Sequence, residues 1–338
     1  MAKFSIIIPI RKINDYLMES VEKIKELDYK DFEVWVITDE YENYDFGDAR
    51  FKILSSGNVG PAKKRNLGAQ RSSGEILAFL DDDAFPRKDW LSVAEGIFLK
   101  PEVYALAGAT LTPQSATFLE NLSGKILESP FIGGPTIFRY KPGASRRIID
   151  DSPTVNLFVR KDAFLSVGGF IADYWPGEDT KLCLDLTKKF GVGFPYEPDL
   201  IVYHHRRELM LPHLKQISRY GRQRGQFSRV LPDNSPIFPY FIPSMWVVGL
   251  FLGPVVCFFV PVLWQVYFFV VRLYLNILLY EFIIKSFEQE SLLAGYYVSI
   301  GMFLTHIVYG YNFIVGFIGR TSLKLRKIDA ETGNYIEG

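Results

Sequence analysis

A long stretch without charge limits what this chain can fold into. Residues 234–271 contain no Asp, Glu, Lys or Arg, and residues 291–319 form a second such run, interrupted only by His306. A single helix over the first run would be about 57 Å long at roughly 1.5 Å per residue, whereas the hydrocarbon core of a bilayer is about 30 Å thick. The two runs therefore predict a membrane-embedded C-terminal region with a break in it, rather than a helix buried in a globular core.

The number of membrane crossings depends on Arg272. Two spans near 242–270 and 292–318 leave Arg272 and the charged residues that follow it outside the bilayer. Three spans, split near Pro261, would bury Arg272 near mid-membrane at a cost of roughly 2.5–3.5 kcal/mol. Basic segments flank the region on both sides, which places both flanks in the cytoplasm and favours an even count. We expect two spans; three spans, or a hairpin with a re-entrant segment, are the alternatives.

Charge is concentrated ahead of the uncharged runs. The chain has 38 basic and 38 acidic residues, so its net charge is zero and no nucleic acid is expected as a partner. The predicted division is a folded domain over 1–230 with an interfacial basic segment at 206–230, a transmembrane region over 231–319 and a cytoplasmic tail over 320–338. The lipid bilayer is therefore a predicted partner.

The first 80 residues alternate between strand and helix patterns. Apolar β-branched runs predict strands, and apolar residues at helical spacing predict helices. The predicted strands cover 4–10, 32–38, 51–56 and 75–80, and the predicted helices cover 14–27 and 61–72. Repeated strand–helix–strand units imply an α/β fold, with a Rossmann-like, mainly parallel sheet and helices on both faces. Ligands bind beyond the carboxyl ends of such strands.

Acidic residues follow two of these strands. Asp39 ends the second strand, and Asp81, Asp82 and Asp83 follow the fourth directly. Three adjacent carboxylates repel one another and need solvent or a cation. Mg²⁺ or Mn²⁺ is held by a few carboxylates together with the oxygens of a substrate diphosphate, and the cation neutralises charge on a leaving phosphate. A solvated loop or a helix start is the structural alternative to this metal site.

These segments resemble the inverting family-2 glycosyltransferases of GT-A fold, in particular the membrane-anchored enzymes that build exopolysaccharide or other lipid-linked glycans. The resemblance spans roughly residues 3–230, and its most specific part is "GNVGPAKKRNLGAQRSSGEILAFLDDDAFP". It implies a DxD pair, in which Asp83 is the direct metal ligand and Asp81 contacts ribose or metal. It also implies that Asp179, in "WPGEDTKLC", is the catalytic base, preceded by Glu178.

The resemblance also implies binding residues. Those for the nucleotide sugar are Pro9, Asp39, Arg65, Asn66, Asp81, Asp82 and Asn156. Those for the acceptor or the diphosphate are Gln216, Arg219, Tyr220 and Arg222. The metal ligands would be Asp83 and Asp81, with His204 or His205, which end a predicted strand, as a further ligand. Lys181 and Asp185 depart from the family pattern, and we expect them to face away from the reacting atoms.

Several of these roles have structural alternatives. An acid such as Asp179 in the first turn of a helix is favoured by the helix macrodipole alone. The arginines between 219 and 229 could hold anionic lipid headgroups beside the bilayer instead of a substrate diphosphate. Asp39 could lie in a solvated turn.

The resemblance implies a glycosyltransferase that depends on Mg²⁺ or Mn²⁺ and inverts the anomeric centre. It would move a sugar from a nucleotide-diphosphate sugar to a hydroxyl of a membrane-associated acceptor, expected to be a polyprenyl-diphosphate-linked saccharide. A polyprenyl-monophosphate acceptor is one alternative, and a non-catalytic membrane scaffold with a degenerate transferase fold is another. The expected location is an integral membrane protein whose catalytic domain faces the cytoplasm, and a homo-oligomer or a glycan-assembly complex is compatible with it.

Overall fold

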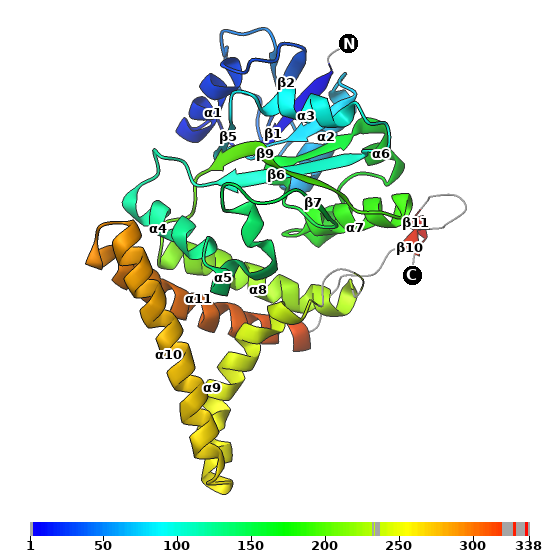
Figure 1. The fold of residues 1–338 in the computed structure, drawn as a ribbon. Coiled ribbons are helices and arrows are strands. Elements are labelled where there is room, and N and C mark those ends of the chain that lie inside the picture. The colour runs from blue at the N-terminus through cyan, green and yellow to red at the C-terminus, as the bar shows by residue number, and fades with distance from the viewer. Residues whose placement is uncertain (1–2, 232, 234–236, 320–326, 329–334, 337–338) are drawn as a thin grey trace. The chain divides into compact units, whose positions relative to one another are not determined.

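The chain forms two compact units. The computed structural model describes residues 3–231, 233, 237–319, 327–328 and 335–336 (Figure 1). The first unit comprises 1–113, 141–205 and 323–338, and the second comprises 114–140 and 206–322. The predicted tail, 320–338, lies outside the described residues except for two short strands, β10 (Lys327–Ile328) and β11 (Tyr335–Ile336), which pair antiparallel.

The first half of the sheet in the first unit is parallel. Its strands are β1 (Phe4–Pro9), β2 (Phe32–Thr38), β3 (Phe51–Ser55) and β4 (Ile76–Phe79), in the order β3-β2-β1-β4. The intervening helices are α1 (Asp15–Lys25) and α2 (Pro61–Arg71). All three strand pairings are parallel. The observed bounds lie within about two residues of those predicted from periodicity.

Strand β8 makes the second half of the sheet mixed. It runs antiparallel to both of its neighbours, β4 and β6, whereas β6 and β9 are parallel, and β5 and β7 each pair antiparallel with β9. The bounds are Ala84–Pro86 for β5, Ala105–Leu111 for β6, Arg147–Ile149 for β7, Leu157–Arg160 for β8 and Phe194–His204 for β9. The sheet is thus parallel where the sequence shows strand–helix repeats and mixed beyond them.

The remaining helices of the first unit lie beside this sheet. They are α3 (Trp90–Phe98), α6 (Lys161–Ser166) and α7 (Glu178–Phe190), with the short 3-10 helices η2 (Thr154–Asn156) and η3 (Ala172–Tyr174). Helix α7 begins with two adjacent acids and ends at Gly191, which has the left-handed conformation that favours glycine.

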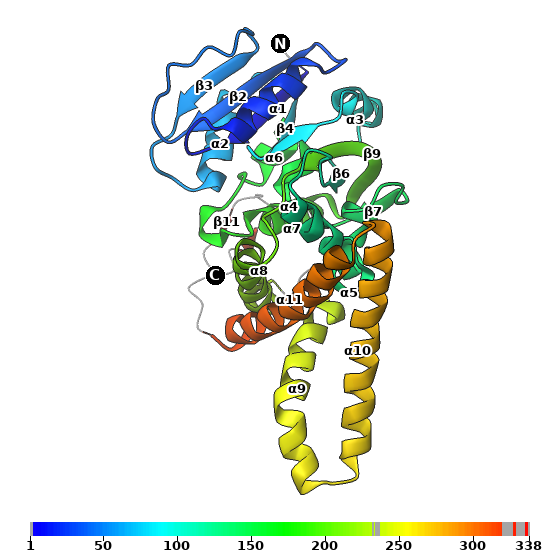
Figure 2. The ribbon, with the colours of Figure 1, turned by 90° about the vertical axis from the view of Figure 1, so that its left-hand side faces the viewer.

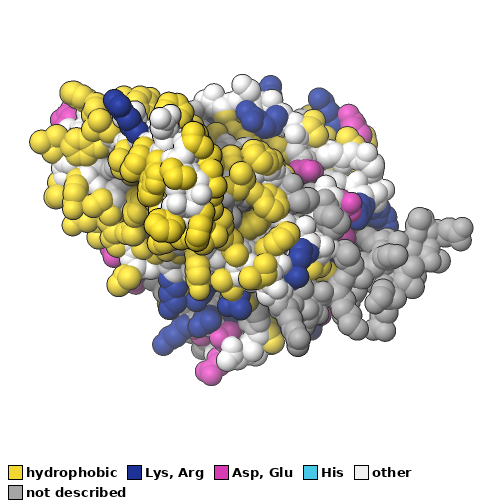
Figure 3. All heavy atoms as spheres, turned by 90° about the horizontal axis from the view of Figure 1, so that it is seen from below, with side chains coloured by type: hydrophobic (Ala, Val, Ile, Leu, Met, Phe, Trp, Pro, Cys, Tyr) yellow, Lys and Arg dark blue, Asp and Glu magenta, His cyan; other side chains and the backbone are white. Residues whose placement is uncertain are grey.

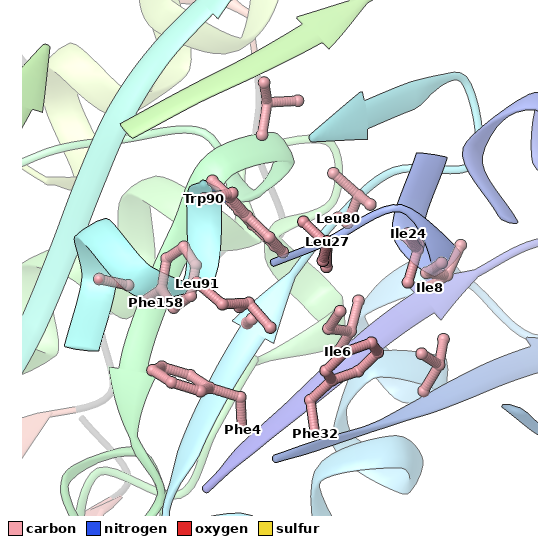
Figure 4. Close-up of a cluster of buried hydrophobic side chains, with 14 of the residues drawn as sticks. Phe4, Ile6, Ile8, Ile24, Leu27, Phe32, Leu80, Trp90, Leu91 and Phe158 are labelled. Atoms are coloured by element: carbon pink, nitrogen blue, oxygen red, sulfur yellow. The ribbon is translucent and has the colours of Figure 1, made fainter. Parts of the chain in front are cut away.

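The two faces of β1 have separate cores. Because successive strand residues point to opposite faces, Ile6 and Ile8 pack with residues of α1, such as Leu17, whereas Ile7 packs with Ala62 and Ala69 of α2. Helices therefore cover both faces of the sheet, as predicted. Figure 4 shows the first of these cores. Burying each large apolar side chain contributes about 1.5–3 kcal/mol, so this packing holds the strand ends in fixed positions.

The second unit is helical. It contains α4 (Phe118–Leu127), α5 (Pro130–Gly133), η1 (Gly134–Arg139), α8 (Leu211–Val230), η4 (Phe238–Phe241), α9 (Ile242–Phe259), α10 (Leu263–Glu288) and α11 (Leu292–Ile318). The basic segment predicted at 206–230 forms α8, and by its contacts it belongs with the apolar helices rather than with the sheet. Segment 114–140 also belongs to this unit.

The first uncharged run folds into two helices instead of one. It breaks between α9 and α10 at residues 260–262, beside the predicted break at Pro261, and α10 continues through Arg272 to Glu288. In the described part of the chain, three helices are long and apolar enough to cross a membrane: Phe238–Phe259, Leu263–Glu288 and Leu292–Ile318. How many of them cross stays a prediction.

A buried histidine joins three helices of the second unit. The ring of His213 on α8 is 1% exposed. Its Nδ1 lies 2.9 Å from Ser123 Oγ on α4, and its Nε2 lies 3.0 Å from Thr305 Oγ1 on α11. A neutral ring can donate to one hydroxyl and accept from the other. Burial lowers the pKa of His213 to about 4, so the ring is neutral at physiological pH.

We expect His213 to make the fold sensitive to acid. The pKa of histidine in an unfolded chain is about 6.5, so between about pH 4 and 6.5 the unfolded state binds more protons than the folded state. The free energy of unfolding should therefore fall as the pH drops through this window, by about 2 kcal/mol at pH 5. Thermal unfolding of the protein in detergent at pH 7 and pH 5 measures this, and His213→Gln should show a smaller difference. An equal difference in both proteins would contradict the assignment.

Candidate active site

The acidic residues singled out in the sequence meet at one edge of the sheet. Strands β2, β1 and β4 are parallel neighbours, so their carboxyl ends lie on the same side. Asp39 follows β2, Pro9 ends β1, and Asp81 to Asp83 follow β4. The fold of the first unit therefore brings Pro9, Asp39 and the triplet to one edge.

Three side chains form a group that could hold a metal ion. Ligand atoms of Asp81, Asp83 and His204 all lie within 4.8 Å of one another. His204 comes from the end of β9, where it is paired with Ala84 of β5, immediately after the triplet. Its Nε2 lies 3.0 Å from Asp83 Oδ1. The β5–β9 pairing thus adds a nitrogen to the two carboxylates of the DxD pair.

His205 lies outside this group. Its Nε2 is 2.8 Å from Glu19 Oε2 on α1, and its backbone N–H donates to the carbonyl of Asp83 at 2.9 Å. Adjacent residues of a strand point to opposite faces, so only one of the two histidines can face the acids. The sequence did not distinguish His204 from His205 as a metal ligand. The geometry supports His204 as the candidate ligand.

Arg65 links the triplet to the start of α7. Its Nη1 donates to Glu178 Oε1 at 2.9 Å, and its Nη2 donates to Asp81 Oδ1 at 2.7 Å. Arg65 is buried, and its Nε has no hydrogen-bond partner among the described residues. Burial alone would lower the pKa of Arg65, but the attraction of Asp81 and Glu178 outweighs it and raises that pKa. The guanidinium therefore stays charged and ties together segments 113 residues apart.

Glu178 and Asp179 have different surroundings. Glu178 is buried; its Oε1 accepts from Arg65 and its Oε2 accepts from the backbone N–H of Gly177 at 3.0 Å. Asp179 is partly exposed, accepts from the N–H of Thr180 at 2.8 Å, and is close enough to Arg65 to help raise the pKa of the guanidinium. Of the two acids predicted to be catalytic, Asp179 is the one with a side chain that reaches the surface.

Asp82 points to α1. Its Oδ2 accepts from Asn14 Nδ2 at 2.9 Å, the same Asn14 that caps α1 by accepting from the N–H of Leu17. Burial raises the pKa of Asp82, and repulsion from Asp83 raises it further, while the Asn14 bond opposes both. The triplet is therefore neither fully solvated nor a helix start, and its middle acid anchors the loop.

Lys64 was missed by the sequence analysis. It is buried on α2, and its Nζ donates to the carbonyl of Ile10 at 2.5 Å and to Asp39. The lysine holds the carboxylate of Asp39 at the sheet edge. The only signal in the sequence was its place beside Arg65 near the start of a helix, where lysines are usually exposed.

Two residues predicted to bind the donor have contacts within the protein, and their binding role stays a prediction. Asn66 Nδ2 donates to the carbonyl of Phe170 at 2.8 Å, and Asn66 Oδ1 accepts from the N–H of Phe170 at 2.9 Å. Asn156 is 1% exposed. Its Oδ1 accepts from Trp90 Nε1, and its Nδ2 donates to the carbonyls of Ala109 and Leu200. These bonds hold the sheet and its loops together, and no described contact directs either side chain to a ligand.

Gly108 lies against the same asparagine. A Cβ at Gly108 would lie 2.0 Å from the carbonyl oxygen of Leu200 and 2.6 Å from Asn156 Nδ2. Only a residue without a side chain allows β6 and β9 to approach this closely.

Lys181 and Asp185 form a buried ion pair within α7. Lys181 Nζ lies 2.5 Å from both carboxylate oxygens of Asp185, and both residues are 2% exposed. Lys181 Nζ also lies 5.6 Å from the centre of the Tyr174 ring. The pair accounts for this departure from the family pattern, because each residue compensates the buried charge of the other.

The residues predicted to bind the acceptor belong to the second unit. Gln216 Nε2 donates to the hydroxyl of Tyr220 at 3.1 Å, one turn along α8. Arg219, Tyr220 and Arg222 are exposed. Their role stays a prediction.

Comparison with known proteins identifies the first part of the chain. Residues 5–161 match the model of glycosyl transferase family 2. The chain carries a family 2 glycosyltransferase domain. A pre-mycofactocin glycosyltransferase of Mycobacterium tuberculosis (strain CDC 1551 / Oshkosh) is 28% identical over 180 residues, which is 52% of this chain and 36% of that protein. This chain therefore spans about a third of the length of that curated relative.

Two further proteins extend the comparison. The GalNAc(5)-diNAcBac-PP-undecaprenol beta-1,3-glucosyltransferase of Campylobacter jejuni is 30% identical over 141 residues, 38% of this chain and 44% of that protein. The mannosyltransferase PcManGT from Pyrobaculum calidifontis, solved with GDP-Man and Mn²⁺, superimposes with a TM-score of 0.59 over 94% of this chain and 88% of that one, at 13% identity. The family and the GT-A fold expected from the sequence are thus confirmed.

Breaking the Arg65 link should destabilise the family 2 domain. Arg65→Met would leave Glu178 buried without its cation, and removing one partner of a buried pair typically costs about 3–5 kcal/mol. We expect Arg65→Met to unfold at markedly lower urea concentration than the parent, measured by tryptophan fluorescence in detergent. The double variant Arg65→Met/Glu178→Met should recover part of the loss. If the loss in free energy of unfolding in the double variant equals the sum of the losses in the two single variants, the two side chains are not coupled.

Proposed function

We propose that this chain is a metal-dependent, inverting glycosyltransferase that moves a sugar from a nucleotide-diphosphate sugar to a hydroxyl of a lipid-linked saccharide. The observation that carries the proposal is the Arg65 bridge. It connects Asp81 of the candidate metal group to the first turn of α7, where Asp179 is partly exposed. A group able to hold a cation and a carboxylate able to accept a proton therefore belong to one site.

The donor set of the metal group favours Mn²⁺ over Mg²⁺. Mg²⁺ prefers oxygen ligands and keeps several waters, whereas His204 would supply a nitrogen beside the carboxylates of Asp81 and Asp83. The solved mannosyltransferase of similar fold was crystallised with Mn²⁺, which supports this choice. When bound, the cation supplies positive charge to the departing nucleoside diphosphate.

Asp179 is the proposed general base. It would take the proton of the acceptor hydroxyl while the hydroxyl oxygen bonds to the anomeric carbon. The bond from that carbon to the donor phosphate breaks at the same time, and its electron pair leaves with the diphosphate. Attack from the face opposite the diphosphate inverts the anomeric centre, and the charge passes through an oxocarbenium-like state. No protein nucleophile is needed, so one carboxylate suffices.

Asp39 is the proposed contact for the nucleotide base. Its carboxylate is held at the end of β2 by Lys64 and lies beyond the strand edge that ends at Pro9. A carboxylate fixed in this way can accept hydrogen bonds from a nucleobase without reorganising. Asp82, held by Asn14, would line the same edge.

The acceptor is proposed to be a polyprenyl-diphosphate-linked saccharide. The Campylobacter jejuni relative is named for an undecaprenol-diphosphate acceptor, and the three apolar helices suggest that this chain is anchored in a membrane. The exposed Arg219 and Arg222 of α8 are suited to the diphosphate of such a lipid. The basic flanks of the apolar region support a catalytic domain on the cytoplasmic face.

Asp179→Asn should abolish transfer while preserving donor binding. The amide has nearly the same shape as the carboxylate but cannot accept the proton, so the rate should fall by about 10²–10⁴-fold. A thermal-shift screen of nucleoside diphosphates with Mn²⁺ first identifies the base, and a radiolabelled donor then measures transfer to membrane lipids. Asp45→Asn, which removes an exposed acid of the loop between β2 and β3 that has no proposed role, is the matched control. Normal turnover in Asp179→Asn would remove this residue as the base.

The metal group can be tested without turnover. Asp83→Asn should weaken Mn²⁺ binding in the presence of a nucleoside diphosphate by at least about tenfold, as seen for perturbed metal sites. His204→Gln removes the nitrogen ligand and should narrow the preference for Mn²⁺ over Mg²⁺. Titration calorimetry measures both, with Asp45→Asn again as the control. Unchanged affinity in Asp83→Asn would show that the cation binds elsewhere.

A further inference from the structure

Helix α11 differs from the other two long apolar helices in its surroundings. In the most apolar stretch of α11, 39% of residues are buried within the protein, against 17% for α9 and 6% for α10. The buried residues of α11 recur at helical spacing from Ala294 to Gly316. Its exposed side chains lie near the two ends, and none of the residues 297–310 is exposed. Protein thus covers more of α11 than of the other two helices, and its middle has no fully exposed side chain.

The C-terminal half of α11 touches α8 backbone to backbone. A Cβ at Gly221 would lie 2.6 Å from the carbonyl oxygen of Tyr309, and a Cβ at Gly225 would lie 2.1 Å from that of Phe313. A Cβ at Gly316 would lie 1.8 Å from the carbonyl oxygen of Arg222. No lipid chain fits between helices in such contact, so α8 and α11 must occupy the same depth in a membrane.

Helix α8 is too charged for hydrocarbon. It carries Lys215, Arg219, Arg222, Arg224 and Arg229, and Lys215, Arg219, Arg222 and Arg229 are exposed. Ionised side chains facing the bilayer core are among the costliest groups to insert. If α11 crossed the bilayer, it would take these residues of α8 into the core with it.

The N-terminal half of α11 is also paired with an amphipathic helix that carries charged residues. Ile126 of α4 packs on Gly301, and Asn121 of the same helix donates to Gln289 Oε1 at 2.7 Å just before α11 begins. The Lys125–Glu128 ion pair lies at the end of α4. Both halves of α11 are therefore bound to helices that belong in water or among lipid headgroups.

Helices α9 and α10 form a hairpin that runs crosswise to α11 (Figures 1 and 2). The two legs, α9 and α10, contact each other beside α11, where the ring of Trp246 on α9 stacks on the ring of Tyr274 on α10 with centroids 4.0 Å apart. Tyr274 Oη in turn lies 2.9 Å from Nδ1 of His306 on α11. Beyond this contact the side chains of the two legs are largely exposed and apolar, and Figure 3 shows hydrophobic side chains gathered on the hairpin.

The free part of the hairpin is shorter than the bilayer core. From Trp246 to Phe259 the first leg rises about 20 Å, and from Leu263 to Tyr274 the second leg rises about 17 Å, against a core of about 30 Å. The turn between the legs, 260–262, consists of Val, Pro and Val. A loop that emerged into water would be expected to be polar, so both length and composition favour a hairpin that ends inside the bilayer.

We propose that residues 246–271 dip into the bilayer from one side and return, while α11 lies along the surface of that side. No helix of the described residues would then cross the membrane. The proposal also explains Arg272, which stands two residues before Tyr274 and so lies at the level of α11, among headgroups. It differs from the predicted spans at 242–270 and 292–318, and it does not depend on the proposed catalytic function.

Cysteine labelling of the full chain in sealed membrane vesicles tests the proposal. Three single cysteines report the two ends of α11 and the hairpin tip: Glu290→Cys, Ile318→Cys and Val262→Cys. Glu102→Cys, on the surface of the first unit, reports the side of the sheet domain. The parent chain sets the background, because Cys183 and Cys257 are both buried. The probe is a membrane-impermeant maleimide, added to vesicles of either orientation.

We expect Glu290→Cys, Ile318→Cys and Glu102→Cys to react in vesicles of the same orientation. Val262→Cys should react in neither orientation, and should react fully once the membrane is dissolved in SDS. Reaction of Glu290→Cys and Ile318→Cys from opposite sides would show that α11 crosses the bilayer. Reaction of Val262→Cys from the side opposite Glu290→Cys would show that the hairpin crosses it. Either result would overturn the proposal.

Discussion

The candidate site depends on one buried guanidinium. Arg65 stands on α2, and its two bonds go to Asp81 after β4 and to Glu178 at the start of α7. A buried charge is tolerated only with well-placed partners, so the three segments cannot shift independently. The neighbouring residues depend on the same segments, because Asp83 lies in the loop that Asp81 begins, His204 pairs with Ala84 directly after that loop, and Asp179 follows Glu178. In the proposed site, the position of Asp179 relative to the metal group would thus be set by an ion pair that itself need not touch substrate.

Local pattern was sufficient to predict the first half of the domain. The apolar runs of β1, β2 and β4, and the acids that follow β2 and β4, can each be recognised within a few residues. Parallel strands then bring their carboxyl ends to one edge of the sheet, irrespective of the rest of the fold. The choice between His204 and His205 was not local, since it depends on how β9 pairs with β5. The structural contacts of Lys64 and Asn156 were not predicted for a related reason: their partners, Ile10 and Trp90, lie far away along the chain.

The membrane region shows a different limit of sequence reasoning. An uncharged helix can face either lipid or protein, and composition alone does not distinguish the two. In α11 the decisive residues are glycines on two helices, Gly221 and Gly225 on α8 and Gly316 on α11, which allow a basic helix to lie against an apolar one. In the sequence, the number of membrane spans depended on where Arg272 lies. The position of Arg272 depends in turn on where along α10 the helix meets α11, which the sequence does not show.

Asn156 and Gly108 restrict how this domain can change over generations. Asn156 must accept one bond and donate two in a space closed by the Gly108 backbone. Aspartate cannot donate, leucine can do neither, and glutamine is one methylene too long for the gap. A side chain at Gly108 would in turn displace the amide. Because a side chain at Gly108 would also meet the backbone carbonyl of Leu200, a change at Asn156 would not make room for it, and both positions should stay fixed while the surface around them drifts.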